Sequence, residues 1–286
     1  MTGMLPSFFV FATPLAEWYG DVPILSSGRM VTREGARSLM HGRDVQILGD
    51  SLARRLAATW FDFMEHVRNE TVEDATLLGA GGNSSLGSPF GHKGVSWTAR
   101  YPNASVRRFD VAWAPRPLDL CPILRATADV VVIALGVHCA INLTIPGENL
   151  PGPAALKQCV HDLRNASTCV CRNQTSQLII WRLAPLMWSA VNFKELQSSL
   201  AINSLVRAFN EHVRHWQSYH CRQVVLVDGE ALLQHRDVGE ARLAGDTPYH
   251  FSYPARFVQV QAILQSIHEA TSGGGHGGGA KSLSAA

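Results

Sequence analysis

One stretch of the sequence constrains the fold more than any other. Residues 128–135 read Ala-Asp-Val-Val-Val-Ile-Ala-Leu, and Gly136 ends the run. β-branched residues favour strands, and an apolar run without polar alternation indicates a strand that is buried on both faces. Parallel sheets are buried in this way because helices cover both of their faces. The run therefore predicts the centre of a parallel sheet between two layers of helices.

Four other stretches have the length and composition of strands, and segments with helical spacing alternate with them. Strands are expected at residues 44–49, 95–101, 177–182 and 223–228. Helices are expected at residues 51–67, 193–219 and 253–269. This alternation predicts an α/β fold, a three-layer α/β/α sandwich with a five-stranded parallel sheet.

The chain is long enough to bury one sizeable core, since it has 286 residues of which 46% are hydrophobic. We expect one domain at residues 41–270. An N-terminal extension at residues 1–40 should pack on this domain or lead into it. Residues 271–286 contain two Gly-Gly-Gly runs, a composition that cannot offset its ordering entropy, so a disordered tail is expected there.

The charge pattern excludes one class of partner. The 25 basic and 23 acidic residues are spread along the chain and leave a net charge of +2. No basic stripe is available for phosphates, so we expect no nucleic-acid partner. No stretch approaches the roughly 18 apolar residues of a membrane span, and neither a signal nor an anchor is evident. The oligomeric state stays open.

Asparagine usage indicates a compartment. Six of the ten asparagines begin an Asn-x-Ser/Thr sequon, where chance gives roughly one. They are Asn69, Asn83, Asn103, Asn142, Asn165 and Asn173. Such an excess favours an N-glycosylated protein of the secretory pathway, in the Golgi lumen or outside the cell.

The six cysteines fit the same compartment. In an oxidising environment they are expected to form disulfides. Cys169-Val-Cys171 lacks the two-residue gap of common zinc knuckles, and no His-Glu-x-x-His is present, so neither a metal nor another cofactor is predicted. Six cysteines allow fifteen pairings, and the sequence does not choose among them.

Ser51 is the first candidate for chemistry. It follows the strand predicted at 44–49 and begins the next helix. Ligands of open parallel sheets bind at the carboxyl ends of the strands, and a helix N-terminus favours an oxyanion or an ionising nucleophile. The alternative is that Ser51 only caps the helix, as serine does at many helix starts.

Two further segments supply partners for such a serine. A serine nucleophile needs a base and an orienting carboxylate, and His250 and Asp246 lie together just before the last predicted helix. Gly136 and His138 follow the strand at 128–135. There a glycine lets a backbone N–H approach a substrate oxygen, and His138 can donate to it or bind substrate. The alternative for this pair is an ordinary turn at the end of a strand.

These segments together resemble a known family. Ile47-Leu-Gly-Asp-Ser51 is similar to the GDS block of SGNH/GDSL hydrolases, and the other blocks resemble the PC-esterase branch, which includes trichome-birefringence-like proteins. The matching blocks are Gly136-x-His138 after its strand, Trp181-Arg182 with Pro185, the strand that ends at Asp228, and Asp246 with His250. The resemblance spans about residues 44–268 and implies the SGNH, flavodoxin-like form of the sandwich.

The resemblance implies a role for each candidate. Ser51 would be the nucleophile, His250 the base and Asp246 its partner. Gly49, Asp50, Gly136 and His138 would surround the oxyanion or the substrate. Arg182 would either meet the substrate or pair with a buried carboxylate.

One departure from the family pattern leaves the carboxylate open. Three residues separate Asp246 from His250, where the family has two. Asp237 or Asp228 is therefore an alternative partner for His250.

The activity implied is that of an ester hydrolase or O-acyltransferase. It would act on acyl esters, most often acetyl esters, of a glycan or polysaccharide through an acyl-Ser51 intermediate. The alternative is an SGNH-fold glycan-binding protein that has lost its chemistry, which the altered spacing motivates. Aromatic rings for stacking on sugars, or for packing the core, are offered by Trp97, Trp113, Trp181 and Trp188.

Overall fold

The structure is a computed structural model, and it describes most of the predicted domain. The described residues are 30–65, 98–100, 106–142, 150–171, 177–186, 193–233 and 251–272. Its strands are β1 (Asp44–Gly49), β2 (Thr98–Arg100), β3 (Arg108–Trp113), β4 (Val130–Ala134), β5 (Ile141–Asn142), β6 (Leu150–Pro151), β7 (Leu178–Leu183) and β8 (Val225–Asp228). Its helices are α2 (Arg33–Met40), α3 (Ser51–Glu65), α5 (Leu120–Ile123), α6 (Pro153–Val170), α7 (Phe193–His220), α8 (Gly229–Leu233) and α10 (Tyr253–Ser272), with 3-10 turns η2 (Pro117–Asp119) and η3 (Val137–Cys139).

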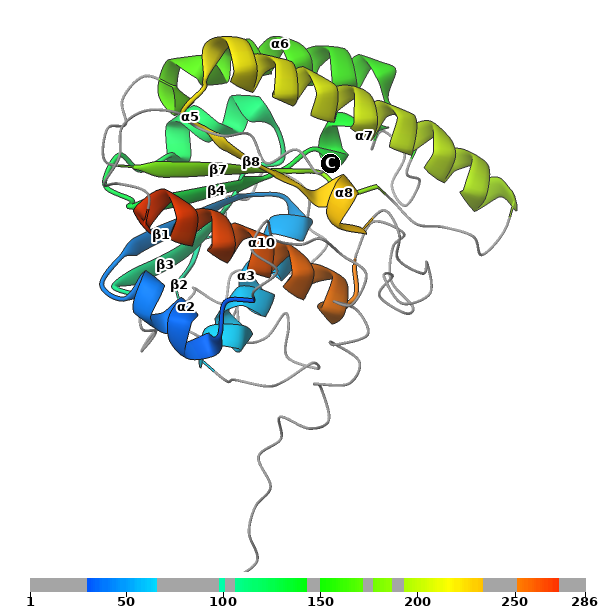
Figure 1. The fold of residues 1–286 in the computed structure, drawn as a ribbon. Coiled ribbons are helices and arrows are strands. Elements are labelled where there is room, and N and C mark those ends of the chain that lie inside the picture. Colours follow the sequence, from blue (N-terminus) through cyan, green and yellow to red (C-terminus); the bar gives the residue numbers. More distant parts are fainter. Residues whose placement is uncertain are drawn as a thin grey trace, which may run out of the picture.

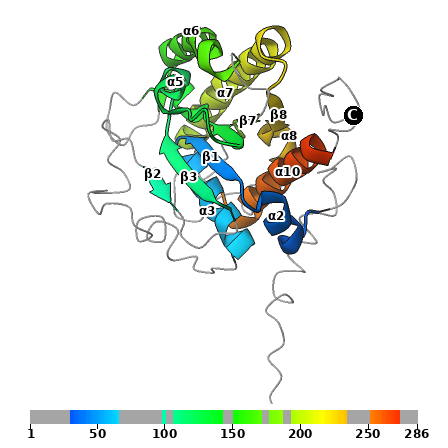
Figure 2. The same cartoon turned by 90° about the vertical axis from the view of Figure 1, so that its left-hand side faces the viewer.

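The main sheet confirms the predicted architecture. Its strand order is β2-β3-β1-β4-β7-β8, and the five strands from β3 to β8 run parallel. Helices α2, α3 and α10 cover one face, and α5, α6 and α7 cover the other (Figure 1). Seen from the second direction, the sheet lies between these two layers (Figure 2). The fold is the three-layer α/β/α sandwich that the sequence indicates.

The central strands are buried as their composition predicts. Every residue of β4 is fully buried, and no residue of β1 is more than 9% exposed. Successive side chains enter opposite cores because strand side chains alternate between faces. Ile47 packs on the α3 side, whereas Leu48 packs on the α6 side.

The identity of one parallel strand was predicted wrongly. The segment at 95–101 contributes only β2, a three-residue antiparallel strand at the sheet edge. The fifth parallel strand is β3, which pairs with β1. Its pattern is hidden by Asp110, a buried carboxylate that forms ion pairs with Arg108 (2.6 Å) and Arg125 (3.3 Å). A charged residue at the centre of a strand is unusual unless it is paired in this way.

The expected domain boundaries remain predictions. Within the expected N-terminal extension, α2 buries Ala36 and Met40 against the domain. The residues before 30 and the Gly-rich tail lie outside the described part of the chain.

Three disulfides resolve the cysteine pairing. They join Cys121 to Cys169, Cys139 to Cys159 and Cys171 to Cys221. Each bond has one partner in α6 or directly after it, so all three fasten this helix to its neighbours. Three disulfides are compatible with a secreted or lumenal protein. Among the described residues, no helix combines the length and hydropathy of a membrane span.

Candidate active site

The carboxyl ends of the parallel strands bring four of the predicted site residues to one edge of the sheet. Asp50 and Ser51 follow β1, and Gly136 and His138 follow β4. These two strands are direct neighbours, with Gly49 opposite Ala134. The edge is where ligands bind in open α/β sheets.

Gly49 makes the sharp passage from β1 into α3 possible. A Cβ atom at this position would overlap the carbonyl oxygen of Ala134 and lie 2.7 Å from the Cβ of Ala53. The backbones of β1, β4 and α3 therefore approach more closely than any side chain at residue 49 permits. This close approach places residue 51 at the start of α3, against the end of the sheet.

Asp50, rather than Ser51, supplies the cap of α3. Its side chain is fully buried, and its Oδ1 accepts a hydrogen bond from the N–H of Leu52 (2.9 Å). This is the contact of an N-cap residue. Ser51 is the first helical residue and is partly exposed. The interpretation of Ser51 as only a helix cap is therefore wrong.

Arg182 lies in the core next to this turn. Its side chain is 1% exposed, and its Nη1 donates to Oε1 of Gln259 in α10 (2.9 Å). Burial lowers the pKa of Arg182 to about 10, while the negative charge of Asp50 acts in the opposite direction. The guanidinium thus remains charged at neutral pH. This position favours pairing with a buried carboxylate over contact with a substrate.

The Gly136 turn has its own steric requirement. Gly136 has a φ of 142°, and a Cβ there would lie 2.8 Å from the Cβ of Ala184. Only glycine fits both the backbone angle and the space. The next three residues form η3, and Cys139 at its end is bonded to Cys159 of α6. His138 is thereby carried on a turn that is fixed at both ends.

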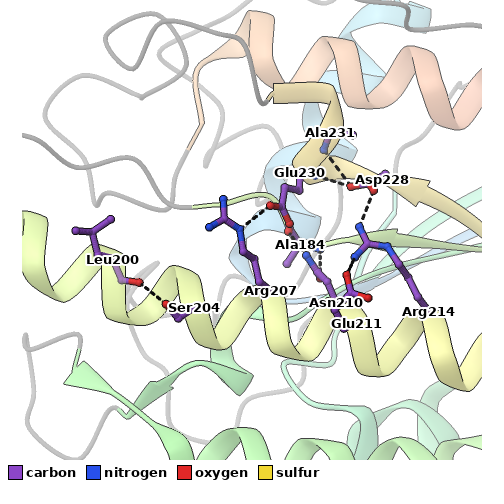
Figure 3. A network of polar contacts seen from close by, with 10 residues as sticks. All are labelled: Ala184, Leu200, Ser204, Arg207, Asn210, Glu211, Arg214, Asp228, Glu230 and Ala231. Carbon is purple, nitrogen blue, oxygen red and sulfur yellow. Dashed lines mark hydrogen bonds and ion pairs between the residues drawn. The ribbon is translucent and has the colours of Figure 1, made fainter. Parts of the chain in front are cut away.

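Asn210 is a site-supporting residue that the sequence prediction missed. It is fully buried in α7, and its side chain clamps the backbone of Ala184, the residue that faces Gly136 (Figure 3). Its Oδ1 accepts from the Ala184 N–H (3.0 Å), and its Nδ2 donates to the Ala184 carbonyl (2.9 Å). The sequence does carry a signal for this role. Asn210 shares the spacing of one helical face with the buried residues Val206, Phe209 and Val213, so a polar side chain is expected to be buried there.

Asp228, one of the alternative partners for His250, is engaged elsewhere. Its Oδ1 accepts from the N–H groups of Glu230 (3.1 Å) and Ala231 (3.0 Å), which caps α8 (Figure 3). Its Oδ2 pairs with Arg214 of α7 (2.6 Å). Both carboxylate oxygens therefore hold the end of β8 against α7 and α8.

The remaining candidates lie either outside the described residues or in the core. Asp237, Asp246 and His250 lie outside the described residues, as do Trp97 and Trp188. Trp181 is fully buried and packs edge-on against Trp216 (5.3 Å), which is a core role. In the part of the chain that the structure describes, no three His, Cys, Asp or Glu side chains cluster as metal ligands.

The site also contains an aromatic contact between the end of β3 and the turn after β4. The ring centroids of Trp113, the last residue of β3, and His138 are 5.6 Å apart, and the ring planes are inclined at 80°. Both side chains are partly exposed. Edge-to-face geometry of this kind is favourable for aromatic pairs.

Comparison with known proteins gives matches in structure only. No family model and no curated protein matches the chain. The chain is similar to Axe2, an acetylxylan esterase from Geobacillus stearothermophilus, at 16% identity and a TM-score of 0.42, over 80% of this chain and 95% of that one. It is similar to Est24, a carbohydrate acetylesterase from Sinorhizobium meliloti, at 11% identity and a TM-score of 0.41, over 80% and 99%.

A third similar structure is a putative platelet activating factor from Streptococcus pneumonia, at 12% identity and a TM-score of 0.43, over 90% of this chain and 98% of that one. Identities this low do not transfer an activity.

Proposed function

We propose that this chain is a serine-dependent SGNH-type ester hydrolase or O-acyltransferase that acts on acetyl esters of glycans. One observation carries the proposal: Ser51 is the partly exposed first residue of α3 at the carboxyl edge of the sheet, while Asp50 performs the capping role. A serine at a helix N-terminus, where the neighbouring residue holds the N-cap position, is suited to nucleophilic chemistry. The resemblance of its surrounding blocks to the PC-esterase branch supports the substrate class.

The proposed mechanism has two acyl-transfer steps. Ser51 Oγ attacks the carbonyl carbon of the ester while His250 accepts its proton, with Asp246 orienting the imidazole. The tetrahedral oxyanion receives hydrogen bonds from the N–H groups of Ser51 and Gly136, with His138 nearby. Collapse breaks the ester C–O bond, and the departing sugar oxygen takes the proton from His250 to become a hydroxyl. Water or a second sugar hydroxyl then attacks acyl-Ser51 and gives its proton to His250, which returns a proton to Ser51 Oγ as the acyl group leaves.

The buried pair beneath the site has a supporting role in this proposal. Asp50 holds the first turn of α3 through the Leu52 N–H. Arg182 supplies the positive charge that compensates the buried Asp50 carboxylate. We therefore assign Arg182 to positioning the Gly49–Ser51 turn rather than to the substrate.

A second candidate function is a glycan-binding protein without catalysis. The observation that favours it is the extra residue between Asp246 and His250. If the carboxylate cannot reach the imidazole, the base loses its orientation, and the same edge of the sheet would still bind sugars.

Acetate release distinguishes the two candidates. With partially acetylated xylo-oligosaccharides, the purified protein should release acetate, and EDTA should not reduce the rate because no metal takes part. Adding unacetylated xylo-oligosaccharide as an acceptor separates hydrolysis from transfer, since only a transferase moves the acetyl group to it. Sugar binding without acetate release or transfer would instead support the glycan-binding candidate.

Substitution identifies the carboxylate that orients His250. Asp246→Asn should lower kcat by roughly 10²- to 10⁴-fold, because an amide cannot hold the imidazole in the required tautomer. Asp237→Asn is the matched control and should leave kcat within about threefold. The measurement is steady-state acetate release by both variants. The reverse pattern would assign the role to Asp237.

We also propose that the protein works in the secretory pathway or outside the cell. Three disulfides and six sequons support this compartment, and Asn165 is exposed on α6. A mass loss on endoglycosidase treatment of protein from eukaryotic cells tests the proposal. An unchanged mass would count against it.

A further inference from the structure

Trp113 differs from the other tryptophans that the structure describes. Trp60, Trp181 and Trp216 are at most 3% exposed, and each packs in one of the two cores. Trp113 alone among these four is partly exposed, and it lies at the edge of the sheet where the site is. A partly exposed indole at the edge of the sheet where ligands bind is placed to contact a ligand.

The strand order places this side chain beside the end of β1, the strand that leads into Ser51. β1 lies between β3 and β4, and Trp113 is directly opposite Gly49 in the register. The Ala114 N–H donates to the Gly49 carbonyl (2.8 Å), which fixes the backbone there. Trp113 comes from β3 and His138 from the turn after β4, yet their rings are in contact. The two side chains therefore meet across the end of β1, the strand that delivers Ser51.

The face of the sheet on which the Trp113 side chain lies agrees with this placement. Phe109, Val111 and Trp113 alternate to one face of β3. Phe109 packs edge-on against Trp60 of α3 (5.6 Å), so this is the face that α3 covers. Ser51 begins α3, at the same end of the sheet at which β3 finishes with Trp113. The indole and the proposed nucleophile thus share one face and one edge.

We propose that Trp113, supported by His138, forms the subsite that stacks against the pyranose ring bearing the ester. A pyranose has an apolar face of C–H groups and a rim of hydroxyls, so it fits an indole that presents apolar surface beside polar groups. Stacking there holds the acetylated hydroxyl over Ser51. This inference rests on the proposed function and adds to it the residue that selects a sugar ester over an ester without a ring.

The test compares two acetate esters that differ in the ring. The substrates are methyl tri-O-acetyl-β-D-xylopyranoside and glycerol triacetate. For Trp113→Ala, the ratio of kcat/KM for the xyloside to kcat/KM for the triacetate should fall about 10-fold or more, mainly through KM. Trp113→Phe keeps a ring and should retain the ratio within about threefold. Leu118→Ala, a control in η2 at a side chain 57% exposed, should not change the ratio.

Each outcome decides the inference. An unchanged ratio in Trp113→Ala, or an equal loss on both esters that Trp113→Phe also shows, would overturn the subsite and make Trp113 structural. If the wild-type protein cleaves neither ester, the proposed function fails, and saturation-transfer NMR with the xyloside then tests the subsite alone. Binding that Trp113→Ala abolishes would support it, and absence of binding to the folded wild-type protein would overturn it.

Discussion

Ser51→Ala is expected to lower kcat/KM for acetyl esters by about 10³-fold or more, because the variant lacks the oxygen that carries the acyl group. The fold should persist. Asp50, which caps α3 through Leu52, is untouched, and alanine is the best helix former at a partly exposed helical position such as residue 51. Acetate release by matched amounts of both proteins measures the effect, and circular dichroism with thermal melting verifies that the variant is folded.

Measuring both activity and folding of Ser51→Ala separates a catalytic role of Ser51 from a structural one. A folded Ser51→Ala variant that kept wild-type activity would place the nucleophile elsewhere. A variant that lost activity together with its fold would instead make Ser51 a structural residue, contrary to the assignment of the cap to Asp50.

Gly49→Ala is expected to have the largest effect on stability. The added methyl group would overlap the Ala134 carbonyl and lie 2.7 Å from the Ala53 Cβ, so β1, β4 or α3 must move. Overpacking of this kind costs about 3 kcal/mol, and more where backbone atoms are the obstacle. Urea denaturation should show a lower free energy of unfolding with a similar m-value.

Gly42→Ala is the matched control for that substitution. Gly42 has a φ of 70°, but no atom lies within 4 Å of the position its Cβ would take. Alanine there pays only for the left-handed backbone, about 1 kcal/mol. If Gly49→Ala destabilised the protein no more than Gly42→Ala does, the close approach at the β1–α3 turn would not be a determinant of the fold.

The sequence predicted most of the sheet because burial leaves a local signal. β4 and β7 are runs of apolar residues, and the segments between strands have helical spacing, so their positions could be predicted within a few residues. β3 was not predicted because Asp110 interrupts its apolar pattern. One of the arginines that neutralise this carboxylate is Arg125, fifteen positions away, so the local sequence does not show that Asp110 can be buried.

Parts of the site depend on which strands and helices are neighbours in space, and the local sequence does not show this. Gly49, Asp50, Ser51 and Gly136 were predicted because they lie at or just after the end of a strand. Trp113 was predicted only as one of four tryptophans for sugar stacking or core packing. Singling it out requires knowing that β3 lies beside β1, whereas the two are separated in sequence by α3 and β2. The disulfide pairing likewise depends on which helices are neighbours, and six cysteines in a sequence do not carry that information.

Labelling by a fluorophosphonate tests whether Ser51 is an activated nucleophile. The reagent forms a stable adduct with an activated serine, which mass spectrometry of the digested protein assigns to a residue. We predict one adduct on Ser51, absent from Ser51→Ala and formed far more slowly in His250→Ala, because the base activates the hydroxyl. A folded wild-type protein that stayed unlabelled, or was labelled at another residue, would show that Ser51 is not the nucleophile.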